Sequence, residues 1–326
     1  MKIIVYPDAS EGIEEILAGR RRESLEQLGE LKVFYDTPVD HQEFLRRIHG
    51  AHALLVGWAL PIEVMTQTPT LEMLSFTGTG ASNFIDLSAA ANQGITVCNC
   101  PGYADNTVAE HTLALLFAVA RHVPQLDAEL RKGCWNQSLD GMELRGKQLG
   151  VIGFGGIGRR VSKLARALGM TVKVWTGNPT SARAQEHDVV FVPLDELLKN
   201  SDVISVHVAL NDDTKNLINS EKIKQMKPGA ILINTARGEI IDEAALVDSL
   251  RERHLKAAGL DVYHQDPLPS DHPLLVLDNV VLSPHVAYNT PEAGNQIYEI
   301  AVENIVKYYE GTPINVVASP GARSTQ

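Results

Sequence analysis

The sequence predicts an α/β protein with two doubly wound domains, each built on a parallel sheet. A chain of 326 residues is longer than most single hydrophobic cores, so two domains are expected. Short apolar runs of strand length alternate with segments of helical spacing, which is typical of parallel sheets covered by helices on both faces. This alternation is interrupted near residue 100 and begins again near residue 147, which indicates two separate arrays.

The composition excludes several classes of protein. The hydrophobic fraction of 44% and the charged fraction of 21% are those of a globular protein, and no apolar run is long enough to span a bilayer. A net charge of -11 leaves no basic surface to neutralise phosphates, so we expect neither a nucleic-acid partner nor a membrane partner. Cys98, Cys100 and Cys134 are too few for a disulfide framework, and no second Cys/His pair completes a metal site. We therefore expect buried thiols, no bound metal and a cytoplasmic location.

The first array covers about the first hundred residues. Strands are expected over residues 2–6, 31–35, 53–56 and 74–77. Residues 12–28 and 41–48 have helical spacing, and Asp8 and Asp40 are placed to cap these two helices. Cys100-Pro101-Gly102 then marks a break in the pattern.

A long apolar helix is expected over residues 105–122, after the break. It is apolar nearly all round, which predicts burial either in a core or in a subunit interface. We therefore expect a homodimer joined through this helix. The second array follows, with strands expected over residues 148–152, 171–175, 189–192, 203–208, 231–235, 257–262 and 280–283, and an amphipathic helix over residues 291–309 ends it.

A glycine motif lies between the first strand of the second array and the next helix. The motif is Gly153-Phe154-Gly155-Gly156-Ile157-Gly158. Gly153 permits a tight turn, Gly155 lets the backbone approach a pyrophosphate, and Gly158 lets helix and strand pack closely, while the helix N-terminus attracts the phosphates. This context predicts a dinucleotide site of the Rossmann type, although a glycine-rich turn or a site for another adenosine ligand is the alternative.

The residues after the next strand bear on the choice between NAD and NADP. NAD sites place an acidic residue there to bind the ribose diol. This chain has Thr176-Gly177-Asn178, with Arg183 a few residues further on. Thr176, Asn178 and Arg183 favour NADP over NAD, because they offer hydroxyl, amide and guanidinium groups to a 2′-phosphate. Arg183 as a solvated helix residue is the alternative.

Three further segments follow strands of the second array: Asn234-Thr235-Ala236-Arg237-Gly238, Asp261-Val262-Tyr263-His264-Gln265-Asp266-Pro267 and Ser283-Pro284-His285-Val286-Ala287. Together with the glycine motif, with Val108-Ala109-Glu110-His111 and with Gly146-Lys147, they resemble the D-isomer-specific 2-hydroxyacid dehydrogenase family over nearly the whole chain.

The residues also make chemical sense by themselves. The planar guanidinium of Arg237 suits the carboxylate of a 2-oxo acid and can polarise its carbonyl group. His285 suits the proton transfer that accompanies hydride delivery near neutral pH, and Asp266 would fix its tautomer and stabilise the imidazolium. The alternative is that Arg237 only caps a strand end and that His285 is a core histidine. Where the family usually has Glu, this chain has the shorter Asp266, which predicts a longer or water-bridged contact to His285 and argues against formate as the substrate.

The resemblance implies further roles. It implies that the backbone amides of Thr79 and Gly80 bind the substrate carboxylate, and that Asp261 accepts a hydrogen bond from the nicotinamide carboxamide. The implied cofactor contacts also include Val208, Thr214, Thr235, Ala236, Arg237 and His285. The implied domains are a discontinuous, flavodoxin-like substrate-binding domain (1–99 plus 288–326) and a dinucleotide-binding Rossmann domain (100–287), with a cleft between them.

The expected reaction is hydride transfer from NAD(P)H to a small 2-oxo acid, which gives the D-2-hydroxy acid. Pro101-Gly102-Tyr103 and Tyr288 are most similar to the hydroxypyruvate and glyoxylate reductases of the family. The substrate loop has no cluster of Lys and Arg, which argues against phosphoglycerate as the substrate. Because some relatives of the family are dinucleotide-sensing corepressors, a binding protein with little turnover is the alternative.

Overall fold

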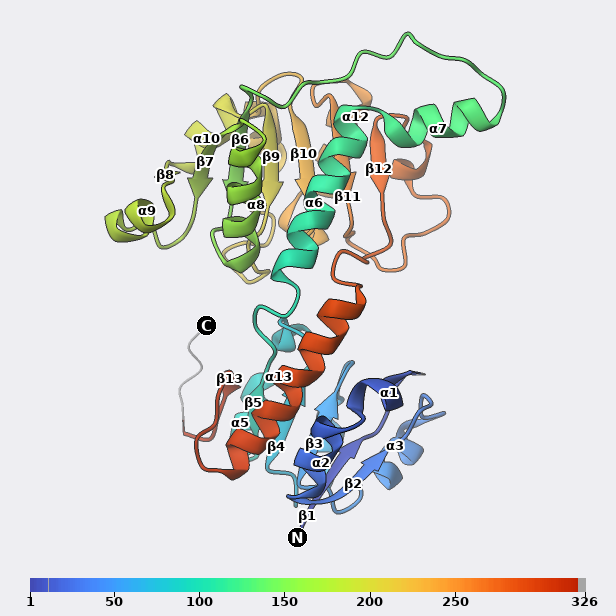
Figure 1. Ribbon diagram of the computed structural model, residues 1–326, viewed down its shortest axis with the longest axis vertical. Coiled ribbons are helices and arrows are strands. Elements are labelled where there is room, and N and C mark those ends of the chain that lie inside the picture. Colours follow the sequence, from blue (N-terminus) through green and yellow to red (C-terminus); the bar gives the residue numbers. More distant parts are fainter. Residues whose placement is uncertain (11, 322–326) are drawn as a thin grey trace. The chain divides into compact units, whose positions relative to one another are not determined.

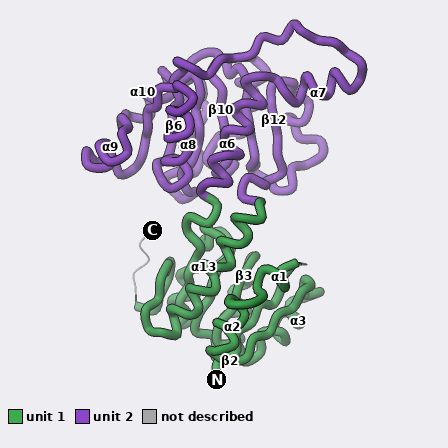
Figure 2. The backbone as a smooth tube through the Cα atoms, in the orientation of Figure 1, with its two compact units in different colours: residues 1–104, 290–326 green, residues 105–289 purple. Residues whose placement is uncertain are grey.

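The computed structural model describes residues 1–10 and 12–321, and the chain divides into two compact units (Figure 2). Unit 1 comprises Met1–Ala104 and Thr290–Gln326, and unit 2 comprises Asp105–Asn289. The sequence predicts a first boundary after residue 99, five residues before the observed one after Ala104. It predicts a second boundary after residue 287, two residues before the observed one after Asn289.

Unit 1 contains a six-stranded sheet in the order β13-β5-β4-β3-β1-β2. Its strands are β1 (Lys2–Tyr6), β2 (Gly29–Val33), β3 (Ala53–Val56), β4 (Met73–Phe76), β5 (Thr96–Cys98) and β13 (Val316–Ala318). All pairs are parallel except β13 with β5. The order β2-β1-β3-β4-β5 is that of flavodoxin-like sheets, so the expected fold of this unit is confirmed.

Helices cover both faces of the sheet in unit 1 (Figure 1). One face packs against α1 (Ile13–Leu17), α2 (Arg20–Glu26) and α13 (Pro291–Tyr309), and the other against α3 (His41–Arg47), α4 (Ile62–Gln67) and α5 (Leu87–Asn92). A 3-10 turn, η1 (Ala81–Asn83), follows β4. Because α13 ends the chain's second array but packs in unit 1, this unit is discontinuous in sequence.

The prediction of a single helix over residues 12–28 is wrong, because two helices lie there. Gly19 adopts φ 67° and ψ -134°, a conformation that is accessible to glycine but not to other residues, and it separates α1 from α2. Gly12, not Asp8, precedes the first turn of α1. The prediction for Asp40 is confirmed, since its side chain accepts a hydrogen bond from the Glu43 amide at 2.8 Å and caps α3.

Unit 2 contains a seven-stranded parallel sheet in the order β12-β11-β10-β9-β6-β7-β8. Its strands are β6 (Gln148–Ile152), β7 (Thr171–Trp175), β8 (Val190–Phe191), β9 (Val203–Val206), β10 (Ile231–Asn234), β11 (Ala257–Leu260) and β12 (Val280–Leu282). The strand order reverses between β6 and β9, as in Rossmann domains, and ligands of such sheets bind at the carboxyl ends of the strands near this reversal.

The helices of unit 2 also form two layers (Figure 1). α6 (Asp105–Ala120) and α8 (Gly156–Ala167) pack on one face, and α10 (Leu194–Asn200), α11 (Ser220–Gln225) and α12 (Glu243–Arg251) pack on the other. α7 (Val123–Arg131) and α9 (Ser181–His187) have no buried residue, and the 3-10 turns are η2 (Gly238–Ile240) and η3 (Pro273–Val276).

The prediction that all three thiols are buried is wrong for one of them. Cys98 and Cys100 are buried, and burial raises the pKa of each to about 12. Cys134, however, is exposed. Among residues 1–10 and 12–321, no helix is long and apolar enough to cross a membrane, and no group of His, Cys, Asp and Glu side chains is arranged to hold a metal ion.

Candidate active site

Three neighbouring parallel strands of unit 2 end beside one another. β10 pairs with β11, and β11 pairs with β12, so the loops that follow them leave the same edge of the sheet. These loops carry Arg237, Asp266 and His285, the three residues for which the sequence predicts catalytic roles.

The structure brings His285 and Asp266 into direct contact. Nδ1 of His285 lies 2.8 Å from Oδ2 of Asp266, and the two side chains are 38% and 42% exposed. The shorter acid therefore reaches the imidazole without a bridging water, so the predicted longer contact is wrong. When Nδ1 carries a proton it donates to the carboxylate, which leaves Nε2 as the other ring nitrogen.

Asp261 holds the backbone around His285. Its carboxylate, in a residue only 1% exposed, accepts hydrogen bonds from the amides of Val286 (3.0 Å) and Ala287 (2.8 Å) and from Oγ of Ser283 (2.6 Å). Burial alone would raise the pKa of Asp261, but the hydrogen bonds from His111, Ser283 and the two amides lower it below its usual range. The predicted bond from the nicotinamide carboxamide would have to share these same oxygens.

His285 itself has φ 54°, in the left-handed region that is uncommon for residues other than glycine. The two amides that follow it are the ones that Asp261 holds. The buried carboxylate of Asp261 therefore fixes the backbone that directly follows His285.

The turn that carries Arg237 is fixed by the side chain of Asn234. Oδ1 of Asn234 accepts from the Ala236 amide at 3.0 Å, and Nδ2 donates to the Arg237 carbonyl at 2.9 Å. The guanidinium of Arg237 donates only to the Ala236 carbonyl, at 2.6 Å, and forms no ion pair with any described residue. It is therefore a half-buried cation whose charge is available to an anionic ligand.

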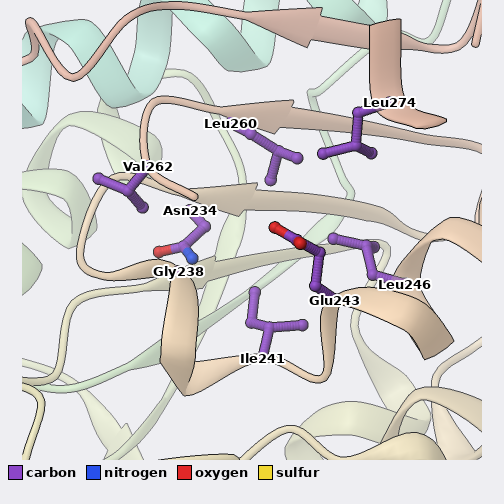
Figure 3. A pocket seen from close by; sticks show the side chains of 8 residues that line it. All are labelled: Asn234, Gly238, Ile241, Glu243, Leu246, Leu260, Val262 and Leu274. Atoms are coloured by element: carbon purple, nitrogen blue, oxygen red, sulfur yellow. The ribbon is translucent and has the colours of Figure 1, made fainter. Parts of the chain in front are cut away.

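Gly238 sets the distance between this turn and the loop that carries Asp266. A Cβ at Gly238 would lie 2.1 Å from the carbonyl carbon of Tyr263, so no other residue fits. The space behind it has a volume of only about 10 Å³ and is lined mainly by aliphatic side chains (Figure 3), so it has no room for a ligand. Glu243 faces this space and accepts from the His264 amide (3.2 Å) and from Nε2 of His272 (3.1 Å).

The glycine motif has the geometry of an anion site. Gly153 has φ 100°, and a Cβ there would lie 2.6 Å from the His207 carbonyl; a Cβ at Gly158 would lie 2.1 Å from the Gly153 oxygen. By contrast, nothing lies within 4 Å of a Cβ at Gly155, which precedes α8 with no side-chain cap. Phe154, Gly156 and Ile157 complete the turn into the helix, whose first amides are free to bind a phosphate. These residues fit a dinucleotide.

Arg183 joins the glycine motif to the segment after β7. Its guanidinium donates to the carbonyl of Phe154 at 2.9 Å and to the carbonyl of Asn178. Thr176 and Asn178 are joined by a hydrogen bond from the Asn178 amide to Oγ1 of Thr176, at 3.5 Å. The guanidinium therefore lies between the glycine motif and the segment after β7, with further N–H groups to donate.

The remaining predicted cofactor residues follow β9 and β10. Oγ1 of Thr214 donates to the Ala209 carbonyl at 2.6 Å and so closes the loop that begins with Val208. Oγ1 of Thr235 lies 2.9 Å from Oγ1 of Thr112 on α6. Ala236 lies in the turn that Asn234 fixes.

Thr79 and Gly80 lie in unit 1, in the loop between β4 and η1. The side chain of Asn99 donates to the Thr79 carbonyl at 2.7 Å, and Oγ1 of Thr79 donates to the Cys100 carbonyl at 3.4 Å. Neither the Thr79 amide nor the Gly80 amide donates to any described residue. These two adjacent amides are therefore available to donate to a ligand.

Sequence reasoning did not assign roles to Asn234, Ser283 and His111. Nε2 of His111 lies 2.9 Å from Oγ of Ser283, which donates to Asp261. All three residues stand inside the segments that carry the family resemblance. The sequence shows that polar residues lie beside apolar strand ends, which could have indicated such roles. It does not show which of these residues form hydrogen bonds with one another.

Known proteins were compared with the chain. A sequence model of the D-isomer specific 2-hydroxyacid dehydrogenase family, for its NAD binding domain, matches residues 113–287. The D-3-phosphoglycerate dehydrogenase of Archaeoglobus fulgidus is 38% identical over 324 residues, 98% of this chain but 60% of that protein. The hydroxypyruvate reductase of Blautia hydrogenotrophica is 36% identical over 302 residues, which are 90% of this chain and 93% of that protein.

Solved structures agree with these similarities. The structure of an acyclic imino acid reductase in complex with NADPH and D-Arg has a TM-score of 0.85 and 33% identity, and the match covers 97% of this chain and 99% of that one. The family model matches more than half of the chain, and two long relatives share over a third of their aligned residues with it. The chain belongs to the D-isomer-specific 2-hydroxyacid dehydrogenase family.

Proposed function

We propose that the protein reduces a small 2-oxo acid of the glyoxylate and hydroxypyruvate type to the D-2-hydroxy acid, with NAD(P)H as the hydride donor. One observation carries the proposal: the His285–Asp266 pair and Arg237, which has no ion-pair partner among the described residues, follow neighbouring strands of a sheet that also carries a dinucleotide motif. The hydroxypyruvate reductase that this chain resembles along almost its full length supports the same substrate class.

The proposed roles follow from the geometry. Arg237 orients the substrate by binding its carboxylate, and it polarises the carbonyl to be reduced. Nε2 of His285 donates a proton to the carbonyl oxygen, and Asp266 stabilises the protonated ring through Nδ1. The amides of Thr79 and Gly80 supply further hydrogen bonds to the carboxylate. Residues 1–99 plus 288–326 then form the substrate-binding domain, and residues 100–287 form the domain that binds the cofactor and carries the catalytic residues.

The cofactor supplies the hydride when it is bound. The residues proposed to hold it are those of the glycine motif together with Thr176, Asn178, Val208, Thr214, Thr235, Ala236, Arg237, Asp261 and His285. The guanidinium of Arg183, held beside Asn178, supports a preference for NADP, because it offers positive charge where an NAD site would have an acid. The unpaired buried thiols of Cys98 and Cys100 support a cytoplasmic location.

The direct test is a spectrophotometric screen of glyoxylate, hydroxypyruvate, pyruvate and bulkier 2-oxo acids, each with NADH and with NADPH. The decrease of the reduced-nicotinamide absorbance measures turnover. We expect reduction of glyoxylate or hydroxypyruvate to the D product. No turnover of any 2-oxo acid with either cofactor would refute the proposal.

The cofactor preference has its own test. In Thr176→Asp, the new carboxylate would bind the ribose diol of NADH and repel a 2′-phosphate, so the ratio of kcat/KM for NADPH to that for NADH should fall about tenfold or more. Thr171→Asp, at the exposed start of the same strand, is the matched control and should leave the ratio unchanged. A wild-type kcat/KM more than tenfold higher with NADH would contradict the preference.

A further inference from the structure

Unit 1 contains a pocket that the proposed roles do not use. Its volume is about 610 Å³, and it lies where β1, β2 and β3 end. Residues from the three loops that follow these strands line it: Asp8, Tyr35, Asp36, Thr37 and Trp58, with Phe44 from α3. A volume of this size is within the range of small-molecule sites.

Asp8 is a partly buried acid beside this pocket. Its Oδ1 is buried and accepts no hydrogen bond from any described residue. Burial raises the pKa of Asp8 to about 6, although the charge of Arg47 opposes the rise. Because a partly buried carboxylate is costly to ionise, a ligand that brings a positive charge beside Asp8 would be favoured here.

No hydrogen bond joins Arg47 to Asp8: the Nε of Arg47 is buried and has no partner among the described residues, and its terminal N–H groups donate to other acceptors. It is 6% exposed, and its guanidinium donates to Oδ2 of Asp36 at 2.9 Å and to Oε1 of Glu43 at 2.8 Å. Three carboxylates therefore stand around one guanidinium, and no Lys or Arg lines the pocket. The pocket is negatively charged whenever Asp8 is ionised.

Aromatic side chains form the other part of the wall. Trp58 is 61% exposed, which is unusual for the largest apolar side chain at the end of a buried strand, and Tyr35 and Phe44 line the same space. Aromatic rings beside carboxylates are the surroundings that bind ammonium and guanidinium groups, through charge and through cation–π contacts.

The sheet order relates this pocket to the free amides of Thr79 and Gly80. Those amides follow β4, which pairs with β3, and β3 pairs with β1, the strand that leads to Asp8. Neighbouring strands are about 4.8 Å apart, so the ends of β4 and β1 are separated by roughly 10 Å along the same sheet edge. An extended aliphatic stem spans such a distance.

We propose that this pocket binds the cationic end of a substrate side chain, so that the preferred 2-oxo acids include those with a guanidinium or ammonium group on an aliphatic stem. The inference rests on the proposed function, since the carboxylate end of the same molecule would bind at Thr79 and Gly80. Asp8 accepts the hydrogen bonds of the cation, and Trp58 covers it. A side chain that ends in a phosphate or carboxylate is repelled by Asp8 and Asp36.

The test compares two 2-oxo acids of nearly equal shape, that of arginine and that of citrulline, which replaces the guanidinium by a neutral ureido group. We expect the wild-type kcat/KM to be about tenfold to a hundredfold higher for the arginine compound, the range of a hydrogen bond between charged groups. Asp8→Asn should bring the ratio of the two values close to one. Glu14→Gln, which removes an exposed carboxylate from α1, is the matched control and should leave the ratio unchanged.

Equal kcat/KM values for the two compounds in the wild type would overturn the inference while leaving the proposed function intact. Calorimetric titration with butylguanidinium, which cannot be reduced, separates the two ideas. The cation pocket is supported if the wild type and Glu14→Gln bind butylguanidinium and Asp8→Asn does not. If the same protein turns over no 2-oxo acid, only the proposed function fails. No binding to the wild type would contradict the pocket.

Discussion

At the scale of single residues, the pair of His285 and Asp266 is open to a direct test. Removing the imidazole in His285→Ala removes the proton donor, and kcat should fall by roughly 10²- to 10⁴-fold, the range of general acid catalysis. Asp266→Asn keeps the size of the side chain but removes the charge that stabilises the imidazolium, so kcat should also fall, by about tenfold or more.

Asp266→Glu is the matched control, because it restores the charge and should retain most of the activity. The affinity for NADPH, measured by fluorescence titration, should change little in Asp266→Asn. An undiminished kcat in Asp266→Asn would show that the 2.8 Å contact is structural only.

Arg237 gives a second prediction at this scale. Its guanidinium forms no ion pair with a described residue, so its charge is not needed to balance an internal acid. Arg237→Ala should lose most of kcat/KM with little change in thermal stability. Arg237→Lys should recover only part of it, since a point charge cannot replace a planar, bidentate donor. Full recovery by lysine would contradict bidentate binding of the carboxylate.

At the scale of elements, two glycines of one motif should behave differently when each is replaced by alanine. A Cβ at Gly158 would lie 2.1 Å from the Gly153 oxygen, so Gly158→Ala forces α8 away from β6 and should cost about 1–3 kcal/mol of stability or more. A Cβ at Gly155 meets nothing within 4 Å, so Gly155→Ala should fold normally.

The same methyl group at Gly155 would occupy the space into which a pyrophosphate fits, so Gly155→Ala should weaken NADPH binding without lowering the melting temperature. The measurements are thermal unfolding and a fluorescence titration of the two variants in parallel. Equal loss of stability in both variants would show that the motif is only a tight turn.

The elements also show how far sequence reasoning reaches. The runs at β1, β3, β6 and β7 are predicted to the residue, because apolar runs of strand length are bounded by clear breaks. The predictions for β9 and β11 extend two residues too far, to Val208 and Val262, because apolar residues continue into the loops that carry the site. α7 was not predicted at all, since it has no buried face to give a periodic pattern.

The sequence predicts where the proposed site residues lie on the sheet, but not the contacts that hold them. Arg237, Asp266 and His285 follow successive strands, and that placement can be read from the order of the motifs. The hydrogen bonds that Asp261 makes to the amides beyond His285 depend on a backbone with positive φ, which no periodicity shows. The pocket around Asp8 could not be predicted either, because it combines three loops that are distant in sequence.

At the scale of the whole molecule, the exposed apolar surface of unit 2 bears on the predicted homodimer. α6 buries only one face, and Phe117 on its other face is 41% exposed. α7, which follows α6 in the chain, exposes Val123 and Leu130, each by 55%, and Trp135 after it is 78% exposed. In Figure 1, α7 and the loop after it extend beyond the sheet of unit 2. Exposed apolar side chains gathered on consecutive elements are typical of protein interfaces.

We expect this surface to join two copies of the chain, so light scattering at micromolar concentration should give the mass of a dimer. The double variant Phe117→Asp and Leu130→Asp places charges on both helices and should yield monomers, because a buried unpaired carboxylate in an interface is strongly unfavourable. Val276→Asp changes a residue that is 80% exposed on η3, away from these helices in sequence, and serves as the matched control that should stay dimeric. A monomeric wild type would refute the prediction, and a double variant that remains a dimer would place the interface on another surface.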